Sequence, residues 1–116
     1  MTTSPLNENA SVTLDGSGNG TVKMVPWGGG VTWQPSSVSV KCSSAMNEAV
    51  CKIYVGPSAT DPYFVDGTFS GSTGDSSDRV SSYQVDTHGN NLWAVWSGGD
   101  AGATATMSVS GVTQQP

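Results

Sequence analysis

The sequence predicts an all-β fold, an antiparallel β-sandwich of jelly-roll type with about eight short strands. Residues that favour strands dominate: Val occurs 14 times, whereas the helix formers Leu and Glu occur three times and twice. Apolar and polar residues alternate in short runs, which is the period of a half-buried strand. Segments rich in Gly, Asn and Asp separate these runs, as turns between antiparallel strands do.

The length of 116 residues suits one domain. Residues 1–10 are polar and aperiodic, and we expect them to form a flexible N-terminal arm. The sandwich domain is expected over 11–112, followed by a short C-terminal tail at 113–116. The expected strands are, in order, 11–14, 21–25, 36–42, 51–55, 63–70, 80–85, 92–96 and 103–112. Residues 71–78 are expected to form an open loop, and 43–50 is compatible with one helical turn.

The two cysteines, Cys42 and Cys51, each end an alternating run. If the two runs pair as an antiparallel hairpin, Cys42 faces Cys51 and all apolar residues of both runs fall on one face. Lys41 and Lys52 then fall on the opposite, solvated face. Two interpretations remain open for the cysteines: a cross-strand disulfide, or two buried free thiols that act as small apolar residues.

The charge balance argues against nucleic acid and membrane partners. The formal net charge is −5, and four cations cannot neutralise many phosphates or bind strongly to an anionic membrane. No apolar run reaches the roughly 18 residues of a membrane-spanning helix. No basic segment followed by an apolar one opens the sequence, so synthesis in a cytoplasm is expected.

Two groups of aspartates are candidate calcium ligands. The segment 15–20, D-G-S-G-N-G, resembles the first half of a calcium-binding loop, but Pro26 stands where that loop needs Glu. Asp66, Asp75 and Asp78 flank or lie in the 71–78 segment. In both groups a plain glycine-rich turn or a solvated loop is the favoured interpretation, and no metal or other cofactor is expected.

His88 is the single histidine of the sequence. A catalytic Ser-His-Asp triad would have to combine it with the nearby Asp86 and one of the many serines. No nucleophile motif such as G-x-S-x-G stands in the chain, and the segment 86–91 has the composition of a turn. We therefore expect no catalytic residues and no enzymatic activity.

The four tryptophans are the heaviest apolar groups. Trp33 and Trp96 are expected in the core, because aliphatic residues are few. Trp27, between Pro26 and three glycines, is expected to be exposed. The alternation in 103–112 places Thr104, Thr106, Ser108 and Ser110 on one polar outer face, which suits hydrogen-bonded contact with another protein.

Several segments together carry a resemblance to a known class of proteins. They are G-T-V-K-M-V-P (20–26), V-T-W (31–33), S-V-S-V (37–40), C-K-I-Y-V-G (51–56), D-G-T-F-S-G (66–71) and L-W-A-V-W-S-G-G-D-A-G-A-T-A-T-M-S-V-S-G (92–111). With these segments the chain resembles the small β-sandwich virion proteins of tailed phages that infect actinobacteria. The element W-S-G-G-D-A-G-A-T-A-T (96–106) is the most specific part.

The resemblance implies a non-enzymatic capsid decoration (minor capsid) protein on the virion surface, synthesised in the host cytoplasm. Its implied partner is the major capsid protein lattice, with a homo-oligomer such as a trimer on the particle. Proteins of this kind are also assigned to tails. The residues expected at the interface are Pro5, Leu6, Trp27, Gly28, Gly29 and Gly30.

The alternative function is a tail- or fibre-associated receptor- or carbohydrate-binding module. An exposed aromatic side chain with a nearby Asp or Asn would serve it, since aromatic faces stack on sugar rings. The candidates are Trp27, or Tyr63 near Asp61.

Overall fold

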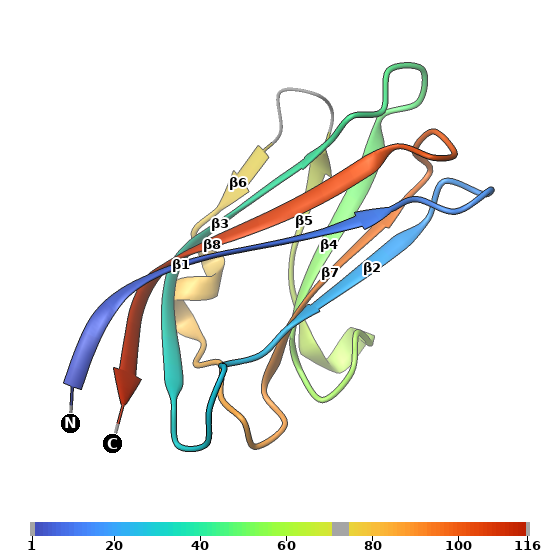
Figure 1. Cartoon of the computed structure of the whole chain (residues 1–116). Coiled ribbons are helices and arrows are strands. Elements are labelled where there is room, and N and C mark those ends of the chain that lie inside the picture. The colour runs from blue at the N-terminus through green and yellow to red at the C-terminus, as the bar shows by residue number, and fades with distance from the viewer. Residues whose placement is uncertain (1, 71–74, 116) are drawn as a thin grey trace.

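The computed structural model describes residues 2–70 and 75–115, which fold into two antiparallel sheets packed face to face (Figure 1). Sheet A has the strand order β1 (Thr2–Thr13), β8 (Thr104–Gln115), β3 (Thr32–Cys42), β6 (Asp75–Ser77). Sheet B has the order β2 (Gly20–Met24), β7 (Asn91–Ser97), β4 (Ala49–Gly56), β5 (Phe64–Ser70). Two short 3₁₀ turns, η1 (Asp61–Tyr63) and η2 (Arg79–Ser82), lie in the connections. The prediction of an all-β sandwich is confirmed.

The strands pair in a nested order. The first strand pairs with the last, β2 with β7, β3 with β6 and β4 with β5, and every pair is antiparallel. Additional ladders join β8 to β3 and β7 to β4. The nested order is compatible with the jelly-roll prediction, in which a long folded hairpin is rolled into two sheets.

The core lies between the sheets and follows the alternation of the strands. On β8 the inward residues Ala105, Met107 and Val109 are buried, while the residues between them are partly or fully exposed. The same alternation on β7 buries Leu92, Ala94 and Trp96. Trp33 and Trp96 both lie in the core, which confirms the prediction for these two residues.

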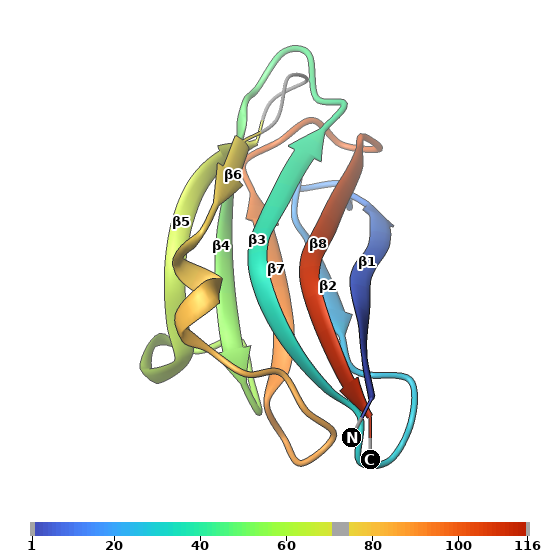
Figure 2. The same cartoon turned by 90° about the vertical axis from the view of Figure 1, so that its left-hand side faces the viewer.

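The expected flexible arm is wrong, because residues 2–10 belong to strand β1. This strand pairs with β8 along its whole length, from Thr2 opposite Gln115 to Thr13 opposite Thr104. The side chain of Leu6 reaches the core and is 3% exposed. For the same reason the expected tail is wrong for 113–115, since β8 continues to Gln115. Figure 2 shows β1 and β8 side by side, with both chain ends at one end of the sandwich.

The expected hairpin of the two cysteine-bearing strands is also wrong. β3 lies in sheet A and β4 in sheet B, so the chain crosses between the sheets at 43–48. The apolar residues that the alternation singled out are nevertheless buried, and Lys41 and Lys52 are exposed as predicted. Two strands that pair as a hairpin in one sheet, and two strands that face each other across the core from different sheets, bury the same alternate residues. The period of the apolar residues alone therefore cannot distinguish the two arrangements.

Smaller differences concern the connections. No helical turn forms in 43–50, and 80–85 forms η2 followed by a single bridge from Val85 to Trp33 where a strand was expected. The expected loop 71–78 contains the short strand β6, and its residues 71–74 lie outside the described residues.

Candidate functional site

The outer face of sheet A is covered by short polar side chains (Figure 2 views this face). It is polar because the alternation that buries the apolar side of β8 turns every second residue outward. We name this surface the hydroxyl face. Its members are Asn9 and Ser11 of β1, Ser37, Ser39 and Lys41 of β3, and Thr104, Thr106, Ser108 and Ser110 of β8.

Hydrogen bonds between neighbouring strands tie these side chains together. The hydroxyls of Ser11 and Thr106 bond each other at 2.9 Å, and those of Ser37 and Ser110 at 3.0 Å. The Ser108 hydroxyl donates to the Asn9 Oδ1 at 2.5 Å. In each case the two residues stand directly opposite each other in the strand register. The face is therefore ordered before any partner arrives.

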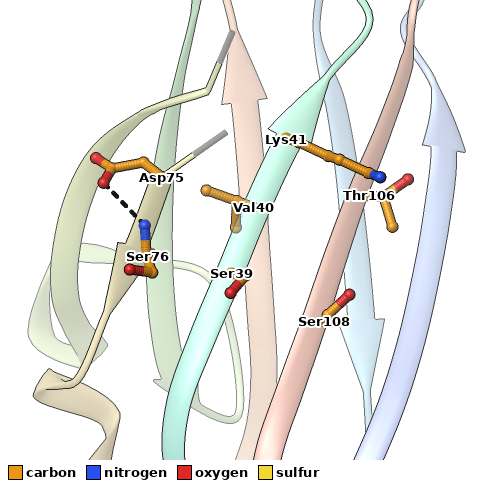
Figure 3. A pocket seen from close by; sticks show the side chains of 7 residues that line it. All are labelled: Ser39, Val40, Lys41, Asp75, Ser76, Thr106 and Ser108. Carbon is orange, nitrogen blue, oxygen red and sulfur yellow. Dashed lines mark hydrogen bonds between the residues drawn. The ribbon is translucent and has the colours of Figure 1, made fainter. Parts of the chain in front are cut away.

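A shallow hollow of about 460 Å³ lies on the hydroxyl face, over β6, β3 and β8 (Figure 3). Lys41 and Asp75 bring opposite charges to it. The Asp75 carboxylate accepts a hydrogen bond from the backbone N–H of Ser76 at 2.8 Å. Lys41 extends from β3 over β8 toward Thr106 (Figure 3). The hollow can therefore accommodate a polar side chain that both donates and accepts hydrogen bonds.

Pro5, one of the residues expected at an interface, lies at the end of the same outer face. It stands opposite Val112 in the register, and both side chains are exposed. Leu6, the next expected interface residue, points into the core and is not available to a partner. This prediction is wrong for Leu6, because inward and outward positions alternate along β1.

The remaining expected interface residues form the corner between β2 and β3. The backbone N–H of Val31 donates to the Gly28 carbonyl at 3.2 Å, and Gly30 has a φ of +79°, which favours glycine. The corner holds Trp27 outside the core with 69% of its surface exposed, which confirms the prediction that this side chain is exposed; its place in an interface stays a prediction.

A groove of about 260 Å³ opens beside Trp27, between the edge strands β1 and β2. We name it the edge groove. Its lining residues are Glu8, Asn9, Ala10, Lys23, Met24, Val25, Trp27 and Trp33. The structure thus brings part of the expected arm, residues 8–10, next to the tryptophan corner, although not as a flexible segment.

The indole N–H of Trp33, a residue that lines the edge groove, is buried without a hydrogen-bond acceptor among the described residues. Trp33 is 3% exposed, and its Nε1 has no hydrogen-bond partner in the part of the chain that the structure describes. The indole of Trp93, by contrast, donates to the Gly56 carbonyl at 2.9 Å, and the Lys23 ammonium lies 5.6 Å from its ring centroid. A buried donor without an acceptor is costly and rare in native proteins.

The aspartates of the expected turns bind backbone groups. The Asp15 carboxylate accepts hydrogen bonds from the N–H groups of Ser17 and Asn19, which lowers its pKa. The Asp86 carboxylate likewise accepts from the N–H groups of His88 and Asn90. These contacts confirm the interpretation of both segments as turns.

The aspartates around the 71–78 segment differ from those of the turns, because Asp66 is bound by side chains and not by backbone groups. The Asp66 carboxylate accepts from the Ser77 hydroxyl at 2.6 Å and lies 3.8 Å from Arg79 Nε. Asp75 lies in strand β6 and Asp78 just beyond it. Within residues 2–70 and 75–115, no three His, Cys, Asp or Glu side chains cluster so that they could hold a metal ion.

Asp100 joins two loops at the end of the sandwich opposite the chain termini. Its carboxylate accepts hydrogen bonds from the backbone N–H groups of Ala45, Met46 and Asn47, at 2.8, 2.8 and 2.9 Å. The backbone N–H of Asp100 donates to the Ser44 hydroxyl at 2.8 Å. These backbone donors hold the pKa of Asp100 at about 2, below its ordinary value of 3.8.

The Asp100 contacts predict a pH dependence of stability. Because the pKa is lower in the folded state, the carboxylate stabilises the fold above about pH 4, and this contribution is lost as the pH falls toward 2. The Asp100→Asn variant should melt at a lower temperature than the wild type at pH 7. The difference should shrink between pH 4 and pH 2, as measured by circular dichroism; a difference that stays constant over this range would contradict the prediction.

Both cysteines are free thiols buried in the core, Cys42 on sheet A and Cys51 on sheet B. The structure thus selects the second of the two interpretations. The pKa of the Cys51 thiol is raised to about 12, chiefly because the thiol is buried. The nearby Cys42 thiol raises this pKa further. At neutral pH Cys51 is therefore protonated and serves as a small apolar residue.

Comparison with known families finds no family model that matches the chain, and comparison with curated proteins finds no match. Among the described residues, no helix has the length and apolar character that crossing a membrane requires.

Proposed function

We propose that this chain is a non-enzymatic structural protein of a phage particle, a capsid decoration (minor capsid) protein that binds the major capsid protein lattice through its hydroxyl face. The resemblance of segments such as 96–106 to small phage virion proteins suggests the particle. The observation that carries the docking surface is the ordered network of short polar side chains across β1, β8 and β3.

Such a face is suited to an extended protein partner. Ser and Thr side chains have few rotamers to lose, and their mutual hydrogen bonds already restrict them, so binding costs little side-chain entropy. Each hydroxyl both donates and accepts, so the face can match peptide groups and polar side chains of a shell. The exposed pair Pro5 and Val112 adds apolar contact at one end.

In the proposed assembly, each copy of the protein binds the capsid weakly, and many copies act together. Charged residues are only 11% of the chain, and Lys41 is the one cation among the named members of the hydroxyl face. Binding should therefore depend weakly on salt, unlike steering by a strongly charged surface. Copies that associate with one another on the shell, as in the expected trimer, gain avidity and stabilise the lattice.

The test is co-sedimentation of the purified protein with separated heads and tails of the phage that encodes it, with the number of bound copies quantified. The wild type should bind heads in many copies and leave tails bare. The Ser39→Arg and Ser110→Arg variants place long charged side chains on the hydroxyl face and should reduce binding to heads by at least about tenfold. Thr21→Arg, with the same charge change on the outer face of sheet B, should bind normally.

Two results would overturn the proposal. Binding to tails, or to neither part of the particle, would exclude a decoration protein. Full binding to heads by both Ser39→Arg and Ser110→Arg would exclude the hydroxyl face as the docking surface.

A further inference from the structure

We infer that Met46 is a modification site: among the described residues, its thioether is the sulfur that a peroxide oxidises first, and a thiol-dependent reductase can reverse the reaction. Met46 lies in the connection 43–48 between β3 and β4, at the end of the sandwich opposite the chain termini (Figure 1). The inference goes beyond the proposed function and does not depend on it.

Exposure distinguishes Met46 from the other described methionines. Met46 has 86% of its surface exposed, whereas Met24 and Met107 are 6% and 0% exposed. Met24 on β2 and Met107 on β8 both belong to the core between the sheets. A peroxide must touch a sulfur atom to transfer oxygen to it, so the rate of oxidation follows access. In the folded protein, Met46 should therefore react well before the two core methionines.

The loop that carries Met46 is fixed by Asp100. The Asp100 carboxylate accepts hydrogen bonds from three successive backbone N–H groups, those of residues 45–47. It also accepts one from the Asn47 side-chain amide at 3.0 Å, and the Ser44 hydroxyl donates to the Asn47 carbonyl. These hydrogen bonds hold the backbone on both sides of Met46 and do not use its side chain. The thioether is thus in solvent in the folded state, and no opening of the fold is needed for a peroxide to reach it.

The two cysteines do not compete with Met46 for the oxidant. Cys42 and Cys51 are free thiols and are 1% and 0% exposed. A thiol reacts with peroxides as the thiolate, and the pKa of about 12 keeps the Cys51 thiol protonated at neutral pH. A thioether has no proton to lose, so the reaction of Met46 needs no ionisation step.

The oxidation transfers one oxygen atom from hydrogen peroxide to the Met46 Sδ. A lone pair of the sulfur attacks one peroxide oxygen, so that the S–O bond forms and the O–O bond breaks. The other oxygen leaves as water after taking up the proton of the transferred one. The sulfur loses two electrons, and the peroxide gains them. In the reverse reaction two thiols supply two electrons, become a disulfide and release the sulfoxide oxygen as water.

Oxidation at this site changes the surface of the protein and preserves its fold. The Met46 side chain is not part of the core, and the hydrogen bond to Asp100 uses its backbone N–H, which the sulfoxide retains. A sulfoxide at Met107 would instead bury a polar oxygen between the sheets. At Met46 the reaction replaces an exposed apolar group with a polar one, and this change is reversible.

The test treats the purified full chain with hydrogen peroxide at neutral pH and follows each methionine by proteolysis and mass spectrometry. Met46 should gain its oxygen at least about tenfold faster than Met24 and Met107. Met1 lies outside the described residues and is measured on its own peptide, apart from this comparison. The same treatment in concentrated urea should bring the rates of the three methionines together, because the fold no longer covers two of them.

Met46→Leu is the matched variant, because it keeps an exposed apolar side chain and removes the sulfur. Its core methionines should stay unoxidised for as long as the wild type needs to oxidise Met46. Wild-type protein oxidised at Met46 should keep its melting temperature and both free thiols. Two thiol-dependent reductases, one for each sulfoxide epimer, should together return Met46 to the thioether.

The inference is overturned if Met24 or Met107 is oxidised as fast as Met46 in the folded protein, or if thiols are lost before Met46 reacts. Rapid oxidation of the core methionines in Met46→Leu would have the same meaning. A lower melting temperature after oxidation at Met46, or a sulfoxide that both reductases together leave in place, would also contradict it.

Discussion

Replacing Leu6 with Ala should lower the free energy of unfolding by about 2–5 kcal/mol, although Leu6 lies in a polar, aperiodic N-terminal segment. The reason is that β1 is a full strand of sheet A, and Leu6 fills space between the sheets with 3% of its surface exposed. Truncation to Ala removes its apolar contacts and leaves a cavity. Urea denaturation followed by circular dichroism measures the change.

The neighbouring Asn7→Ala substitution is the matched control. Asn7 points outward and is exposed, so its removal should change the free energy of unfolding by less than about 0.5 kcal/mol. Equal, small effects at both positions would mean that residues 2–10 are a flexible arm after all.

Trp96→Ala should have an effect of about 3–5 kcal/mol on the same measure. Trp96 is fully buried on β7, the strand that stands between β2 and β4. Its register partners are Gly20 on β2 and Cys51 on β4. Trp96 has the largest of the fully buried side chains among the described residues, so its truncation to Ala leaves a large cavity between the sheets.

The matched control is Trp27→Ala, which removes the same side chain from an exposed position. It shows whether the loss of stability comes from burial in the core or from the loss of any tryptophan. Because most of the Trp27 ring is in solvent, Trp27→Ala should cost less than about 0.5 kcal/mol. A Trp96→Ala variant as stable as Trp27→Ala would contradict the packing described for the core.

Strands with one buried and one solvated face were predictable from the sequence. The predicted 103–112 corresponds to most of β8, because apolar and polar residues alternate along it, and the predicted 92–96, a short apolar run bounded by turn residues, corresponds to β7. Residues 2–10 of β1 were not predicted as a strand, although 11–14 was, because β1 is an edge strand whose inward positions are not all apolar. Leu6 and Ala10 are separated by Glu8 at the open edge, which breaks the period of two.

The candidate sites were predictable only as single residues. The exposure of Trp27 follows from its neighbours Pro26 and Gly28, and the polar outer side of β8 follows from alternation. The edge groove joins residues of β1, β2 and β3, and only the assembled sandwich brings them together. The unpaired indole N–H of Trp33 depends on three-dimensional surroundings that no local pattern records.

The nested pairing also orders events during folding. Among the strands that the structure describes, β8 is the only sheet neighbour of β1, so β1 finds its partner only after β8 is available. Closing so long a loop costs little extra stability, but topologies dominated by distant pairs fold slowly. An apolar strand left waiting would invite association with other chains. Residues 2–10 of β1 are polar, which is why they were not predicted as a strand. The same polar composition disfavours association of β1 with other chains before it pairs with β8.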